Sequence, residues 1–290
     1  MESAARIRPV PALRLVEPEH GPRRLQRSVG AARVAFATRG DRTALADLYQ
    51  SGCCKIRLPD QAVSGGAEAI LVNTAGGLTD GDRIAVEARW SAGATAIVTT
   101  QACERIYRSR SDVAAVDNRL DVSHGAHAFW LPQETILFDG GRLRRTAIAE
   151  LSGSAALTAC EAVILGRPAM GETVRSGSYA DSWEIRRDGR LVFADRLALR
   201  GDMAARLDKP GVGGGIRAFA TLLHAGADSE LMRDRLRAAF ADEGIHAGIS
   251  DPGGVMLARL AAADGYALRA MLRVALRTLR PAGLPRVWAG

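Results

Sequence analysis

The hydrophobic positions of this chain change their spacing near residue 215. Before that point, apolar residues occur in short runs and often at every second position, as expected of β-strands. Residues 84–90 are the clearest example, because Ile84, Val86 and Trp90 alternate with small or charged residues. A glycine-rich tight turn at 76–82 separates this segment from an apolar run at 69–73. The pattern predicts a β-rich region.

A weak internal repeat runs through the same region. Residues 91–98, 123–130 and 152–158 each place a polar-edged strand, a glycine turn and a more apolar strand in the same order, with starts 32 and 29 residues apart. An all-strand repeat of this length predicts stacked β-coils, here a layered, helical (solenoid-like) arrangement of strands that we expect to be antiparallel. Chance similarity between small residues is the open alternative.

After residue 215 the pattern favours an α+β portion on an antiparallel sheet. Strands are predicted at 216–224, 245–250 and 255–261. One helix begins at Asp228 or Ser229 and ends near Gly244, and a second spans Tyr266–Leu279. The predicted organisation is a loosely ordered arm at 1–30, a predominantly β layered domain at 31–210, and a C-terminal α+β portion with two helices at 211–290 packed on it.

Composition and charge narrow the function classes. Arginine and lysine outnumber acidic residues by 39 to 32, a formal charge of +7, but the positive charges are scattered and aromatics are only 5%. A nucleic-acid interface needs clustered charge and stacking aromatics, so nucleic acid is not an expected partner. No apolar stretch is long enough for a membrane span, no secretion signal is evident, and the four cysteines are too sparse for a disulfide framework. We therefore expect a cytoplasmic protein.

Familiar catalytic and metal motifs are missing from the sequence. The glycines at 211–215 are not followed by Lys-Ser/Thr, and no nucleophile elbow or zinc-ribbon spacing occurs. His124 and His127 would point to opposite sides of a strand, and the adjacent Cys53 and Cys54 likewise to two faces. We therefore predict no catalytic residue, no permanently bound cofactor and no closed metal site.

Polar side chains embedded in apolar strands are the remaining candidates for chemistry. A carboxylate beside Ile, Leu and Trp must be paired, solvated or functional, because desolvating it alone is costly. One interpretation is structural pairing with Arg105, Arg108 or Arg167. The other is a polar path along which oxygen and sulfur groups pass a borderline cation. The residues concerned are Gln101, Cys103, Glu104, Gln133, Glu134, Glu161 and Glu172.

These runs resemble the urease accessory protein UreD (UreH) family. The similar segments lie in one order over most of the chain, at 71–79, 99–101, 105–108, 130–138, 166–167, 170–172 and 188–192. The segment Trp-Leu-Pro-Gln-Glu-Thr-Ile-Leu-Phe at 130–138 is the most distinctive. Asp80, where the family usually has glycine, and Cys103, where it more often has a small residue, depart from the pattern.

The resemblance implies a non-enzymatic scaffold with a layered, helix-like β fold. Such proteins bind the urease apoprotein and recruit the accessory protein UreF, which brings the GTPase UreG, and nickel is thought to pass through an internal polar channel. Transient Ni2+ would then follow a path for which the candidates are Gln101, Cys103, Glu104, Gln133, Glu134 and Glu172. The arginines at 269, 273, 277 and 280 are a candidate docking surface.

Two other functions stay open on the sequence. One is a β-rich small-molecule enzyme that uses a strand-embedded carboxylate, Glu104 or Glu134, as acid or base. The other is a stand-alone nickel chaperone that binds the ion through Cys103 or through His124 and His127.

Overall fold

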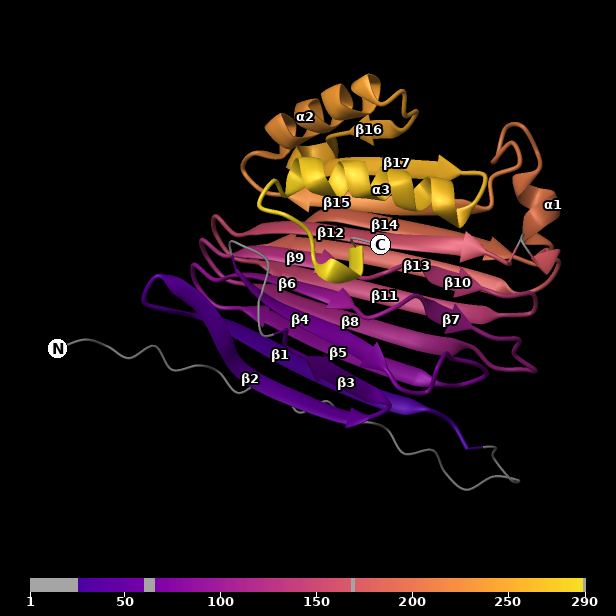
Figure 1. Cartoon of the computed structure of the whole chain (residues 1–290), viewed down its shortest axis with the longest axis horizontal. Coiled ribbons are helices and arrows are strands. Elements are labelled where there is room, and N and C mark those ends of the chain that lie inside the picture. The colour runs from indigo at the N-terminus through magenta and orange to yellow at the C-terminus, as the bar shows by residue number, and fades with distance from the viewer. Residues whose placement is uncertain (1–25, 60–65, 168–169, 289–290) are drawn as a thin grey trace.

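The chain passes back and forth between two stacked β-sheets in the computed structural model, which describes residues 26–59, 66–167 and 170–288 (Figure 1). The first sheet has the order β14-β13-β11-β8-β5-β1-β2. Its strands are β1 (Val29–Arg39), β2 (Arg42–Gly52), β5 (Arg83–Trp90), β8 (Ala114–Val122), β11 (Arg142–Leu151), β13 (Ser178–Arg187) and β14 (Arg190–Arg200).

The second sheet has the order β16-β17-β15-β12-β9-β6-β4-β3. Its strands are β3 (Cys54–Arg57), β4 (Ala67–Asn73), β6 (Thr95–Thr100), β9 (His127–Leu131), β12 (Ala156–Leu165), β15 (Ala218–Ala225), β16 (Gly248–Ser250) and β17 (Met256–Ala262). Two short strands, β7 (Glu104–Ile106) and β10 (Thr135–Leu137), pair in parallel with each other, and β10 also pairs with β12. They extend the second sheet at one end of the molecule.

The sequence repeat corresponds to successive coils of this fold. Each repeat turns at a glycine with positive φ, Gly93 at 70°, Gly125 at 69° and Gly153 at 52°, a conformation that glycine adopts without a steric penalty. The strands that follow stack in parallel, so that Ala96 faces Ala128. The predicted β-rich, solenoid-like class is confirmed.

The predicted antiparallel pairing needs correction, because it holds only at the edges of the sheets. The central strands β1, β5, β8, β11 and β13 run parallel to one another, as do β4, β6, β9 and β12. Each coil crosses to the other sheet and returns in the same direction, which makes neighbouring coils parallel. Antiparallel strands close both sheets at each end.

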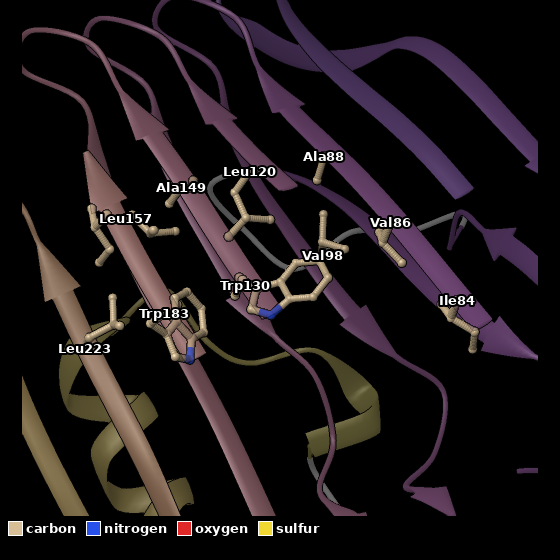
Figure 2. Close-up of a cluster of buried hydrophobic side chains, with 14 of the residues drawn as sticks. Ile84, Val86, Ala88, Val98, Leu120, Trp130, Ala149, Leu157, Trp183 and Leu223 are labelled. Carbon is tan, nitrogen blue, oxygen red and sulfur yellow. The ribbon is translucent and has the colours of Figure 1, made fainter. Parts of the chain in front are cut away.

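The main hydrophobic core lies between the two sheets. Figure 2 shows side chains from both sheets meeting there, with Trp130 and Val98 on one side and Leu120 and Trp183 on the other. Trp183 is 1% exposed and Leu120 and Val98 are fully buried. Each such side chain contributes about 1.5–3 kcal/mol on burial, so this layer holds the coils together.

A second core lies on the outer face of the second sheet, beneath two helices (Figure 1). The predicted helices are confirmed as α2 (Ser229–Asp242) and α3 (Gly265–Leu279), whereas the short α1 (Met203–Leu207) was not predicted. The Asp264 carboxylate caps α3 by accepting from the Ala267 N–H at 2.8 Å. A final 3-10 helix, Arg286–Trp288, buries Trp288 against the sheet.

The predicted N-terminal arm falls mainly on residues 1–25, which lie outside the described residues. Among the helices that the structure does describe, none has the length and apolar character to cross a membrane.

Candidate functional site: a polar cavity between the sheets

A cavity of about 220 Å3 lies between the two sheets, beside β7 and β10. Apolar residues of the first sheet, such as Ile84, Val86 and Leu143, form one wall. The polar side chains of the lining are Lys55, Asn73, Thr100, Gln101, Cys103, Glu104, Arg105, Asn118, Gln133, Thr135, Arg145 and Glu161. Four of the six residues predicted for a nickel path therefore share one cavity: Gln101, Cys103, Glu104 and Gln133.

The outer end of the cavity carries a carboxylate held by an amide. Gln101 is exposed, whereas Glu104 is partly buried. The side-chain amide of Asn73 donates to both Glu104 oxygens, at 3.1 and 3.0 Å, and the Arg105 N–H donates to one of them at 3.1 Å. Burial raises the pKa of Glu104, and the Asn73 bond opposes that shift. The arrangement leaves an oxygen-rich group near the surface.

The inner end of the cavity holds a buried ion network centred on Arg145, which is 4% exposed. Its guanidinium donates to both oxygens of Asp181, at 2.9 and 3.0 Å, and to the Tyr179 hydroxyl at 2.9 Å. It also pairs with Glu161, whose other oxygen accepts from the Trp130 indole N–H at 3.0 Å. The strands β11, β12 and β9 each position one member of the network, and β13 positions two, Tyr179 and Asp181.

The network carries one cation against two carboxyl groups. Burial raises the pKa of Glu161 to about 7, although Arg145 opposes the shift. Burial alone would lower the pKa of Arg145, but Asp181 and Glu161 hold it well above its usual value. The guanidinium therefore stays charged, and Glu161 is the group that changes charge near neutral pH. When both carboxyls are ionised, the inner end has a net charge of −1, which favours a cation.

Two further lining residues have distinct environments. Gln133 is 5% exposed, and its Nε2 has no hydrogen-bond partner among the residues that the structure describes. An unpaired buried amide donor is costly, so this group needs a ligand or water from the cavity. The Cys103 thiol lies 3.5 Å from a Glu134 oxygen, and burial, followed by the Glu134 charge, raises the pKa of the thiol to about 11.

The other two predicted residues lie elsewhere. Glu134 is 1% exposed beneath α3, where Arg269 pairs with it at 2.8 Å and also donates to the Val287 carbonyl at 2.9 Å. Glu172 pairs with Arg167 at 2.8 Å on the surface. Glu172 thus has one of the arginine partners named in the alternative interpretation, Arg167, whereas Glu134 is paired with an arginine that was not named there, Arg269. Of the two carboxylates considered as an acid or base, only Glu104 borders the cavity.

The arginine face of α3 is only partly available as a docking surface. Arg269 lies over the Trp288 ring at 5.1 Å as well as pairing with Glu134, and Arg280 is 4% exposed. Arg273 is half-buried, and Arg277 is exposed. Two of the four arginines therefore attach the helix to the protein rather than present charge to solvent.

Cys53 and Cys54 were predicted to point to opposite faces, and this prediction is wrong. Gly52 has φ +55°, which ends β2 in a turn, so that Cys53 precedes β3 and does not continue the alternation. Both sulfur atoms lie over Gly30 of β1: a Cβ atom there would be 2.5 Å from Cys54 Sγ and 2.7 Å from Cys53 Sγ. Burial raises the pKa of Cys54 to about 12. Cys54 borders the cavity.

The sequence-based selection included Glu161 of the inner network but missed its partners Arg145 and Asp181, and it also missed Asn73 and Asn118. The sequence does contain a signal for the network. Arg145 lies two residues from Leu143 and from Ala147, so it points to the same, buried side of β11 as they do. Asp181 likewise lies two residues before the buried Trp183 and points to the same side of β13. A charged residue at an inward position of a strand marks such a site.

Comparison with known proteins gives one consistent family. The model of the UreD urease accessory protein family matches residues 28–289. Urease accessory protein UreD of Chelativorans sp. (strain BNC1) is 46% identical over 271 residues, which cover 92% of this chain and 96% of that protein. The protein of the same name from Sinorhizobium medicae (strain WSM419) is 45% identical over 268 residues, 91% of this chain and 96% of that protein.

Proposed function

Because the chain belongs to the UreD family of urease accessory proteins, we propose that it acts in urease maturation as a non-catalytic scaffold in the cytoplasm. In this proposal it binds the urease apoprotein and recruits UreF and, through UreF, the GTPase UreG, which hydrolyses GTP. Ni2+ is the transient cargo, and it passes through the cavity between the sheets. No resident cofactor is part of the proposal.

The observation that carries the nickel path is the cavity itself. It leads from the exposed Gln101 to the buried Arg145 network and presents oxygen donors along the way. Over residues 26–59, 66–167 and 170–288, no three His, Cys, Asp or Glu side chains gather as a metal site. Isolated oxygen ligands hold Ni2+ weakly, whereas a complete ligand shell would retain it. This spacing of donors supports transfer over storage.

The maturation role is tested by deleting this gene alone from a host that carries the urease operon. We expect urease protein that is present but inactive and poor in nickel, and recovery of both activity and nickel content when the gene is restored. Full urease activity without the gene would overturn the proposal.

The nickel path is tested by the same carboxylate-to-amide change at two positions. Glu104 borders the cavity, whereas Glu172 pairs with Arg167 on the surface. We expect Glu104→Gln to lower urease activation and nickel content several-fold, while Glu172→Gln leaves both unchanged. Co-purification of each variant with the partner proteins shows that the scaffold still assembles.

The outcomes separate the candidate functions. Equal activation by both variants would exclude Glu104 from the path, and loss of partner binding in Glu104→Gln would make its effect structural. Retention of nickel by the purified chain alone, abolished by changing Cys103 or both His124 and His127, would favour the stand-alone chaperone.

A further inference from the structure

The Cys53 and Cys54 thiols form a close pair at the edge of the cavity. Their sulfur atoms lie at most 5.2 Å apart, the sum of the 2.5 and 2.7 Å distances from a Cβ placed on Gly30. Gly30 has an inward position on β1, two residues before the cavity-lining Ala32, and its missing side chain leaves the space that both sulfurs occupy. Cys54 is 6% exposed and borders the cavity, whereas Cys53 is partly exposed.

The backbone holds this pair in a fixed geometry. The Cys53 N–H donates to the Val29 carbonyl at 3.1 Å, and the Cys53 carbonyl accepts from the N–H and hydroxyl of Thr74 at 2.8 and 3.1 Å. Gly52, just before the pair, approaches β1 so closely that a Cβ there would be 1.8 Å from the Val29 oxygen. Two thiols are therefore brought together by a turn that only glycine can form.

The number of donors selects the ligand. Among the described residues, no group of three or more His, Cys, Asp and Glu side chains could hold a metal, so this pair offers two sulfurs without a third ligand of these four types. Structural zinc needs four ligands, and Ni2+ favours a square-planar set. Thiolates select Cu+, a soft ion. Two metal–thiolate bonds of about 2.3 Å, the length found in zinc sites, span about 4.6 Å in line, within the limit set by Gly30.

We propose that Cys53 and Cys54 form a binding site for one Cu+ ion, held between the two sulfurs at the edge of the cavity. Binding converts both thiols to thiolates: Cu+ and two R–SH give [Cu(SR)2]− and two H+, with no change in oxidation state. The site requires nothing of the proposed nickel path and can be tested on the full chain alone.

The test uses the purified, reduced chain without oxygen, with Cu+ supplied as its acetonitrile complex in competition with the coloured chelator bicinchoninate. We expect the chain to remove one equivalent of Cu+ from the chelator. Cys53→Ser and Cys54→Ser should each weaken retention at least tenfold. Cys103→Ser, a cavity thiol outside the pair, is the matched control and should bind as the unmodified chain does. Circular dichroism checks that each variant is folded.

Alkylation of the unmodified chain provides a measurement that needs no variant. With one equivalent of Cu+, iodoacetamide should modify Cys53 and Cys54 at least tenfold more slowly, while its reaction with Cys103 is unchanged; one equivalent of Ni2+ should protect neither thiol. The proposal is overturned if the chain takes no Cu+, if the pair is alkylated equally fast with and without it, or if the loss of copper follows Cys103→Ser instead.

Discussion

Replacing Arg145 by methionine tests the role of the buried network most directly. Methionine retains the length and apolar body of the side chain but removes every N–H that the guanidinium donates. Asp181 then loses two hydrogen bonds, at 2.9 and 3.0 Å, and Glu161 loses its only cationic partner in the network. Both carboxyl side chains are less than a tenth exposed, so their ionised forms are poorly solvated once the guanidinium is gone.

The size of the effect follows from the burial of both partners. Removing one member of a buried ion pair costs about 3–5 kcal/mol, because an uncompensated charge stays in the interior. A typical domain is stable by only about 5–15 kcal/mol, so Arg145→Met should lose a large part of its free energy of unfolding. The loss should shrink as the pH falls from 8 to 5, because the unpaired carboxyls of the variant take up protons and become neutral.

Urea denaturation followed by circular dichroism measures this loss at each pH. The matched control is Arg144→Met, one residue earlier on β11, where the arginine is 52% exposed and pairs with Asp117, which is 54% exposed. An exposed pair contributes about 1 kcal/mol or less, so this variant should be nearly as stable as the unmodified chain. Equal losses in the two variants, or a loss in Arg145→Met that grows toward acid pH, would refute the reasoning.

Three other substitutions should alter stability in defined ways. Because the pKa of Glu161 is raised, the folded chain holds a proton between pH 4.5 and 7 that the unfolded chain releases. The free energy of unfolding should therefore fall by about 3 kcal/mol as the pH rises from 4.5 to 7. Urea denaturation across this range should show that Glu161→Gln removes the dependence. Arg269→Met leaves Glu134 without its cation and should lower the free energy of unfolding by about 3 kcal/mol. Arg277→Met, at an exposed position of the same helix, should lower it by less than about 0.5 kcal/mol. Equal losses would disprove the role of Arg269 in attaching α3 to the protein. Trp288→Phe loses the indole bond of 3.0 Å to the β9 carbonyl and should lower stability by about 1 kcal/mol, with proteolysis near the C-terminus reporting release of the last helix.

The fold could be predicted from the sequence in its class but not in its strand direction. The alternation in residues 84–90 reports one buried face, and the repeat reports the coils. Alternation is typical of antiparallel sheets because one face is usually solvated there. In this protein the outer face of the first sheet is solvated although its central strands are parallel, so the pattern pointed to the wrong pairing. Direction depends on how each coil returns, which no local pattern encodes.

The cavity could be predicted in part, and its exceptions have physical reasons. Gln101 directly follows β6 and Glu104 begins β7, and the short connection between these strands brings both to the cavity. Glu134 sits in the irregular segment between β9 and β10, where the period-two rule no longer fixes a direction, and it points toward α3. The cysteine pair depends on the φ angle of Gly52, which sequence spacing does not reveal.

The parallel coils also determine the order in which a growing chain can acquire structure. Ala96 of β6 pairs with Ala128 of β9, 32 residues later, and Ala128 pairs with Leu157 of β12 after a further 29. Each coil therefore needs only its predecessor as a template, so the central strands can add one after another as they leave the ribosome. The second sheet gains the antiparallel closure of its β12 edge only when β15 pairs with β12, and β15 begins 53 residues after β12 ends. Until then the β12 edge is open to pairing with other chains, and we expect aggregation of nascent chains to be most frequent while residues 166–217 are being synthesised.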